Sequence, residues 1–205
     1  MGRSSQSFQR KTPRYIVEAT VLIICEDSKS AKRYLEDAKK HFNVDAEVEV
    51  VHLKNTDPIG IVNRAVERMA NFDKIYCVVD RDTHGSFDDA TKAVASLEKV
   101  ELVVSYPCFE YWLLLHFEYS RKGYMPAGKD SPGDQMVKAL RNIPSMKDYD
   151  KGAADGIFEK LLPMLPKAMR HAEKVLKDAE CVKEMNPSTR MHELFDEFEA
   201  MSFSR

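Results

Sequence analysis

The sequence predicts an α/β fold: a parallel sheet flanked by helices, followed by a loop-rich helical C-terminal region. Between residues 16 and 117, short apolar runs typical of strands alternate with segments whose apolar residues recur at helical spacing. Strands separated by helices imply parallel pairing with right-handed connections. From residue 118 to 156 this alternation stops, and glycine and proline become frequent.

Four apolar runs are expected to form the sheet. The segment KIYCVVD is apolar on both faces, which is typical of a central strand, whereas AEVEVVHL alternates partly, as an edge strand does. In chain order, the predicted strands are 17–25, 46–53, 74–80 and 101–106.

The helices follow from apolar stripes and from capping residues. Asp57-Pro58 supplies a cap and a proline for the first helical position, and Asn186-Pro187 is expected to do the same near the C-terminus. Pro163 and Pro166 must bend or break the helical segment that contains them. In chain order, the predicted helices are 28–42, 58–69, 86–99, 108–117, 134–142, 157–180 and 186–201.

Composition predicts a cytoplasmic protein without a membrane-spanning segment. We expect a flexible basic arm over 1–14, an α/β domain over 15–118, and a C-terminal region packed on it over 119–205. The net charge of −2 gives no global basic field, so nucleic-acid binding would depend on local patches. The four cysteines have no metal-ligand spacing, and three of them lie in or beside apolar runs, as reduced core thiols do.

Acidic residues follow two of the predicted strands. Glu26 comes after the first strand, and Asp80 and Asp82 come at the end of the third. The carboxyl ends of parallel strands meet at one edge, so these three carboxylates are expected to converge if the two strands are neighbours. Such a cluster is costly unless a cation lies within it, and Mg²⁺ or Mn²⁺ is the cation that carboxylate oxygens favour.

These motifs carry a resemblance to a known family. An apolar strand ending in Glu, followed later by a strand ending in Asp-x-Asp, is similar to the Toprim fold of topoisomerases, primases and some nucleases. More narrowly, CEDSKSAKRYLE, VVDRDTH, SYPCFEYWLLLHF and NPSTRMHELF resemble the RloB family of bacterial restriction-linked and abortive-infection loci. Asp27 is a departure, because glycine commonly follows the glutamate in that family.

The resemblance implies a metal-dependent nuclease. Glu26 would be a general acid or base, Asp80 and Asp82 would bind Mg²⁺ or Mn²⁺, and Lys29 matches a family lysine. Phosphodiester hydrolysis of DNA or RNA in anti-phage defence follows, with a co-encoded AAA- or ABC-type ATPase as the partner. The choice between DNA and RNA, and the question of a homo-oligomer, stay open.

Several neighbouring residues have two interpretations. Glu110 lies in an apolar helix, where its carboxylate needs either a metal ion or partners at the helix start. Arg81 and His84 flank the acids: Arg81 would form a salt bridge or hold a phosphate, and His84 would be a turn residue or a proton donor. His116 is expected to be a hydrogen-bonded core histidine.

Three other functions compete. VVDRDTH also fits the Asp-x-Asp-x-Thr of HAD phosphatases, with Asp80 as the nucleophile and Ser105 in the second motif. A receiver-like switch would use Asp80 as the phosphate acceptor and Ser105 as its sensor. Both need a later strand with a specific charged tip, and no segment after Phe117 is predicted to supply it. A non-catalytic Toprim-like subunit is the third possibility.

Overall fold

A five-stranded, mostly parallel sheet organises the molecule. The computed structural model describes residues 20–26, 29–50, 57–81, 85–153 and 155–203, so the predicted arm over 1–14 lies outside the described residues. The strands are β1 (Val21–Cys25), β2 (Ala46–Val50), β3 (Lys74–Asp80), β4 (Val100–Tyr106) and β5 (Ser188–Thr189).

The strand order is β2-β1-β3-β4-β5, and β5 alone is antiparallel to its neighbour. The predicted edge position of β2 and central position of β3 are confirmed. Strand β1 pairs with β3, with Cys25 opposite Val78, which meets the condition under which their acids were expected to converge. The order reverses between β1 and β3, and in open α/β sheets ligands bind outside the carboxyl ends of the strands at such a point.

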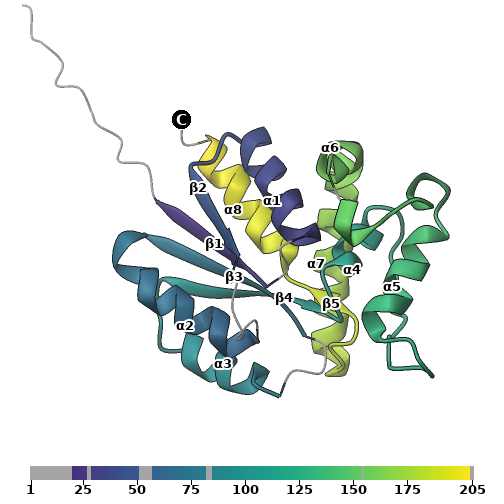
Figure 1. Ribbon diagram of the computed structural model, residues 1–205, viewed down its shortest axis with the longest axis horizontal. Coiled ribbons are helices and arrows are strands. Elements are labelled where there is room, and N and C mark those ends of the chain that lie inside the picture. The colour runs from purple at the N-terminus through teal and green to yellow at the C-terminus, as the bar shows by residue number, and fades with distance from the viewer. Residues whose placement is uncertain (1–19, 27–28, 51–56, 82–84, 154, 204–205) are drawn as a thin grey trace, which may run out of the picture.

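Helices cover both faces of the sheet (Figure 1). On one face, α2 and α3 pack on the alternate residues of β1, β3 and β4. The other face carries a larger core, to which α1, α4 and α8 all contribute. The helices are α1 (Ser30–His41), α2 (Pro58–Arg68), α3 (Phe87–Val94), α4 (Glu110–Leu115), α5 (Pro132–Arg141), α6 (Ile157–Leu161), α7 (Leu165–Val182) and α8 (Met191–Phe203).

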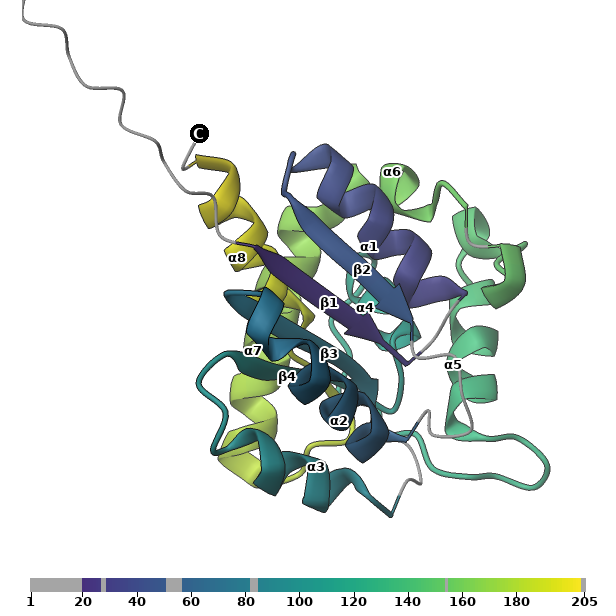
Figure 2. The same cartoon turned by 60° about the vertical axis from the view of Figure 1, so that its left-hand side comes forward.

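The main helices lie within the segments that the apolar periodicity of the sequence predicted. The stripe of Ala31, Tyr34, Leu35 and Ala38 on α1 is buried against the larger core. The apolar segment 108–117 forms the short, fully buried α4. In Figure 2 the arrowheads of β1 and β2 point towards the side where α5 lies, so the carboxyl edge faces the C-terminal region.

Proline and capping residues set the boundaries within the C-terminal region. A 3-10 turn over Leu162–Met164 separates α6 from α7, and Pro166 lies in the first turn of α7, which confirms the predicted break. Helix α5 begins before the predicted residue 134, because Ser131 and Asp134 form a reciprocal capping box ahead of it. Within the described residues, no helix is both long enough and apolar enough to cross a bilayer.

The predicted helix over 86–99 is too long at its C-terminal end. Helix α3 ends at Val94, and the Oγ of Ser96 donates a hydrogen bond to the carbonyl of Ala93 at 3.0 Å. Lys99 reaches away to the carbonyl of Phe72, also at 3.0 Å. Side-chain bonds of this kind compete with helix continuation, which the apolar pattern alone does not reveal.

The prediction that Asn186 caps the last helix is wrong. Its side chain is buried and bridges the backbone of Tyr124: the Tyr124 N–H donates to Oδ1 at 3.1 Å, and Nδ2 donates to the Tyr124 carbonyl at 2.7 Å. Ser188 and Thr189 then form β5 against β4, and α8 begins only at Met191. Pairing of Ser188 and Thr189 with β4 therefore overrides the local preference of this segment for a helix start.

This bridge makes Asn186→Asp a diagnostic substitution. Aspartate is as good an N-cap as asparagine, but a carboxylate cannot donate to the buried Tyr124 carbonyl. We expect Asn186→Asp to lower the free energy of unfolding by about 1–3 kcal/mol, as measured by urea denaturation. Asn63→Asp, at an exposed position of α2, is the control and should change stability by less than about 0.5 kcal/mol. Equal midpoints for the two variants would contradict the bridge.

Candidate active site

Two predicted acids meet where β1 and β3 end. The backbone N–H of Glu26 donates to the carbonyl of Val78 at 3.1 Å, which extends the β1–β3 pairing by one residue. The Glu26 Oε2 in turn accepts a hydrogen bond from the backbone N–H of Asp80 at 3.1 Å. The topology therefore brings Glu26 and Asp80 together at the carboxyl edge, as the sequence predicted.

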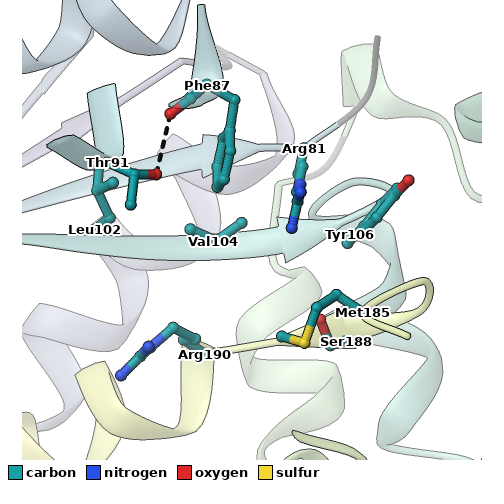
Figure 3. A pocket seen from close by; sticks show the side chains of 9 residues that line it. All are labelled: Arg81, Phe87, Thr91, Leu102, Val104, Tyr106, Met185, Ser188 and Arg190. Carbon is teal, nitrogen blue, oxygen red and sulfur yellow. Dashed lines mark hydrogen bonds between the residues drawn. The ribbon is translucent and has the colours of Figure 1, made fainter. Parts of the chain in front are cut away.

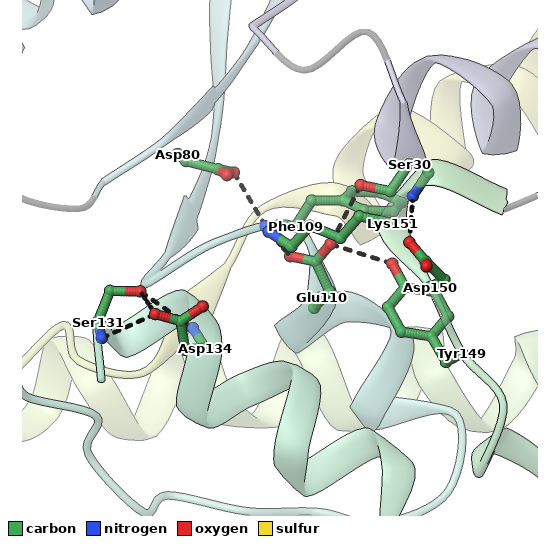
Figure 4. A network of polar contacts seen from close by, with 10 residues as sticks. Ser30, Asp80, Phe109, Glu110, Ser131, Asp134, Tyr149, Asp150 and Lys151 are labelled. Atoms are coloured by element: carbon green, nitrogen blue, oxygen red, sulfur yellow. Dashed lines mark hydrogen bonds and ion pairs between the residues drawn. The ribbon is translucent and has the colours of Figure 1, made fainter. Parts of the chain in front are cut away.

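Asp80 is held by the start of α4. Its Oδ1 accepts a hydrogen bond from the backbone N–H of Phe109 at 2.9 Å (Figure 4). Burial, followed by the negative charges of Glu110 and Glu26, raises the pKa of Asp80 well above its usual range, although Lys151 and the Phe109 N–H oppose the shift. Ionisation of Asp80 therefore has an energetic cost.

Glu110 is the most deeply buried acid of the group. It is 0% exposed in the first turn of α4, and its Oε1 accepts hydrogen bonds from Ser30 Oγ at 3.1 Å and Tyr149 Oη at 3.0 Å. Its Oε2 lies 2.9 Å from the Nζ of Lys151. These partners come from α1 and from the loop-rich region, so Glu110 joins three separate parts of the chain (Figure 4).

Lys151 brings a positive charge to this group of acids. It lies in a 3-10 turn over Lys151–Ala153, and its side chain is 39% exposed. Burial alone would lower the pKa of Lys151, but the charges of Glu110 and Asp80 outweigh it and raise the pKa above its usual value. The lysine therefore stays protonated and offsets part of the negative charge for which the sequence alone predicted a metal ion.

The remaining predicted residues fall in different places. Lys29 is exposed at the residue before α1, next to Ser30 and at the same edge of the sheet. Arg81 points to the opposite face, where its guanidinium lies over the rings of Phe87 and Tyr106. Asp82 and His84, together with Asp27, lie outside the described residues.

His116 is a structural residue. Its ring is buried; Nδ1 lies 3.0 Å from the carbonyl of Trp112, and Nε2 lies 3.1 Å from Tyr34 Oη. Burial lowers its pKa to about 4, so it is neutral at physiological pH. This arrangement confirms the prediction of a hydrogen-bonded core histidine.

Sequence reasoning missed three side chains of the site. Ser30 was taken only as part of a helix, and Tyr149 and Lys151 lie in a segment without periodicity. The one usable signal was indirect: a carboxylate at Glu110 among apolar residues has to find donors. No pattern in the sequence indicates which segment provides them.

The described residues offer a small set of metal ligands. Among them, no group of three or more His, Cys, Asp or Glu side chains is placed to hold a metal ion. Glu110 is already ion-paired with Lys151, so its predicted role as a ligand would require that lysine to move. Glu26 and Asp80 remain as two hard oxygen donors at adjacent strand ends. This pair fits Mg²⁺, which uses one or two carboxylates and otherwise waters and substrate phosphates.

Comparison with known proteins agrees with the motifs and the fold. The RloB-like protein family matches residues 21–198, which is most of the chain. The chain belongs to the RloB-like family. Searches of curated proteins and of solved structures find no match. The α/β architecture with its mostly parallel sheet is consistent with a Toprim-like fold.

Removing the charge of Asp80 should stabilise this RloB-like protein. Asn at this position keeps the acceptor for the Phe109 N–H and removes repulsion from Glu26 and Glu110. We expect Asp80→Asn to gain roughly 1 kcal/mol at neutral pH, which corresponds to about 2–4 °C in melting temperature. Stabilisation together with loss of function is typical of functional sites.

The pH dependence of this gain follows from the raised pKa. A carboxyl whose folded-state pKa is raised stabilises the fold below its unfolded pKa, about 3.9, and loses that contribution as pH rises through the folded-state pKa. The advantage of Asp80→Asn should therefore grow from about pH 4 upward and then level off. Thermal unfolding across this range tests it, with the exposed Asp148→Asn as control. A gain that shrinks with rising pH would refute the assignment.

Lys151→Met should destabilise the RloB-like fold. It leaves the buried Glu110 carboxylate without its cation, although the hydroxyls of Ser30 and Tyr149 remain. Loss of one partner from a fully buried pair costs about 3–5 kcal/mol, and the partial exposure of Lys151 reduces our expectation to about 1–3 kcal/mol. Lys147→Met, at an exposed position of the same segment, is the matched control in urea denaturation. Similar midpoints for both variants would show that the ion pair contributes little.

Proposed function

We propose that this protein hydrolyses phosphodiester bonds of nucleic acid, with Mg²⁺ or Mn²⁺ held by Glu26 and Asp80. The supporting observation is the meeting of these two carboxylates at the point where the strand order reverses. Parallel pairing of β1 and β3 places them there, and α/β sheets bind ligands at such a point. Asp82 is proposed as a further ligand from the family resemblance.

The protein side chains would divide the work between binding and proton transfer. A divalent ion at Glu26 and Asp80 would offset charge on the phosphate oxygens. Asp80 is fixed by the Phe109 N–H, so its second oxygen would face the ion without losing its orientation. Glu26 would move a proton to or from the oxygen that enters or leaves the phosphorus. Lys29, exposed at the same edge, is the proposed phosphate contact.

The charge of the protein supports dependence on a partner. A net charge of −2 gives little general attraction for a polyanion, and binding through a few local contacts is weak and salt-sensitive. An activating or restraining ATPase, which the family resemblance implies, would make up for this weak attraction. Vigorous degradation of nucleic acid by the isolated chain would contradict this part of the proposal.

A non-catalytic Toprim-like subunit is the second candidate, and Lys151 favours it. An internal lysine already neutralises Glu110, so part of the acid cluster is stable without a metal ion. Chemistry of the HAD or receiver type receives less support. Ser105, the second functional residue in both, is buried and shares a 2.8 Å hydrogen bond with Thr189. Strand β5, the strand that follows α4 in the described residues, is antiparallel and leads to Arg190 rather than to the required tip.

Cleavage assays with isosteric variants test the proposal. The full chain, with and without the ATPase encoded beside it, is incubated with mixed DNA and RNA in Mg²⁺, Ca²⁺ or chelator. Glu26→Gln and Asp80→Asn should each lower the cleavage rate by roughly 10²–10⁴-fold, because each removes a charged group from the reaction. Glu101→Gln is the control, since its carboxylate pairs with Lys74 on an adjacent strand, away from the acid cluster.

A binding measurement separates the two candidates. Mg²⁺ should raise the melting temperature of the native chain and leave that of Asp80→Asn unchanged, because a ligand stabilises only the form that binds it. Full cleavage by both acid variants would end the nuclease proposal. Nucleic-acid binding without cleavage under every condition would favour the non-catalytic subunit.

A further inference from the structure

A second feature lies at the same edge of the sheet, on the opposite face from the acids. It is a cavity of about 190 Å³ whose floor includes Leu102 and Val104 of β4 (Figure 3). Arg81 and Tyr106 line it beside the strand ends, and Arg190 lies across from them. The cavity is smaller than the roughly 300–1,000 Å³ of pockets for drug-sized ligands, so it suits one planar ring system.

Arg81 is presented to this cavity as a stacked, planar cation. Its guanidinium carbon lies 4.6 Å from the ring centroid of Phe87 and 5.3 Å from that of Tyr106. Its backbone N–H donates to the Ser105 carbonyl at 2.8 Å, which fixes the base of the side chain. Both rings are uncharged, so these contacts stabilise the guanidinium without neutralising it.

Arg190 places a second cation across the cavity. Its backbone N–H bonds to the carbonyl of Val104 at 2.9 Å, and its Nε pairs with Glu193 at 2.7 Å. The side chain is 47% exposed, so it reaches solvent at the rim. An apolar floor and two arginines at the rim together match a nucleotide: the base suits the floor, and its phosphate suits the cations.

The backbone relates this cavity to the acids. Successive residues of a strand point to opposite faces, so Asp80 faces α4 and Arg81 faces α3. A nucleic-acid chain crossing this edge with one phosphate at Glu26 and Asp80 would bring its next nucleotide over Arg81. The two features therefore lie on opposite faces of the sheet at the same edge.

We propose that the cavity binds one unpaired base beside the phosphate to be cleaved, which makes single-stranded nucleic acid, or an unpaired segment of it, the substrate class. This inference rests on the proposed nuclease function. A paired base is held inside the duplex and would have to lose its pairing and stacking before it entered. Apolar contact with Leu102 and Val104 on the floor tolerates any base, so the site selects strandedness rather than sequence.

The test measures binding without cleavage. Labelled short oligonucleotides, single-stranded and duplex, are titrated with the full-length chain in chelator and followed by fluorescence anisotropy. Arg81→Gln removes the charge, and Arg81→Lys keeps the charge but loses the planar stack. Arg170→Gln, an exposed arginine of α7, is the control. In a parallel series, one nucleotide at a time is made abasic.

The expected results form a double-mutant cycle, in which one change is made in the protein and the other in the oligonucleotide. Both Arg81 variants should bind single strands roughly tenfold more weakly, and the control should bind as the native chain does. One abasic position should cost the native chain a similar factor and cost Arg81→Gln nothing, because both changes remove the contact between the base and the cavity wall that Arg81 forms. Circular dichroism and melting temperature verify that both Arg81 variants are folded.

Three outcomes would overturn the inference: full binding by Arg81→Lys with no sensitive abasic position, a preference for duplex, or no binding by the native chain. Its failure is distinguishable from that of the nuclease proposal. Asp80-dependent cleavage with an unaffected Arg81→Lys variant defeats the base pocket alone. Arg81-dependent binding of single strands without cleavage in any condition defeats the nuclease alone.

Discussion

Parallel pairing of β1 with β3 imposes an electrostatic constraint on the whole carboxyl edge. It brings Glu26 to the backbone of Asp80, and α4 adds Glu110 to the same neighbourhood. Two unit charges about 4 Å apart repel by about 4 kcal/mol at an effective dielectric constant of 20, a large share of the stability of a domain. Such a cluster of acids is stable only where hydrogen-bond donors and cations surround it.

The C-terminal region supplies much of that compensation. Lys151 and Tyr149 come from the loop-rich segment and both contact Glu110, while Ser30 reaches it from α1. The same region adds β5 to the sheet and α8 to the larger core. The loop-rich segment, which the sequence predicted to pack on the α/β domain, therefore also contributes side chains to the site.

The elements that could be predicted well are those fixed by periodicity, whereas the rest depend on single long-range contacts. The central strand β3 ends at Asp80, as its apolar run indicated. In such a periodic pattern several residues indicate the same element, so the prediction does not depend on any one of them. The meeting of Glu26 with Asp80 needed only the additional assumption that β1 and β3 are neighbours. Asn186, by contrast, has a strong local preference for a helix start, yet its amide bridges Tyr124, 62 residues away along the chain. Lys151 has no local pattern at all, and its role is determined by the carboxylate of Glu110, 41 positions earlier in the sequence.

Asp80 and Arg81 point to opposite faces of the sheet, which keeps the arginine away from the carboxylate that we propose as a metal ligand. An arginine on the same face as Asp80 would pair with that carboxylate and compete with a divalent ion for its oxygens. Pointing to the other face, Arg81 is held between Phe87 and Tyr106, where aromatic rings stabilise the cation without neutralising it. One step of the backbone thus separates the anionic group that would bind metal from the cationic group that would bind substrate.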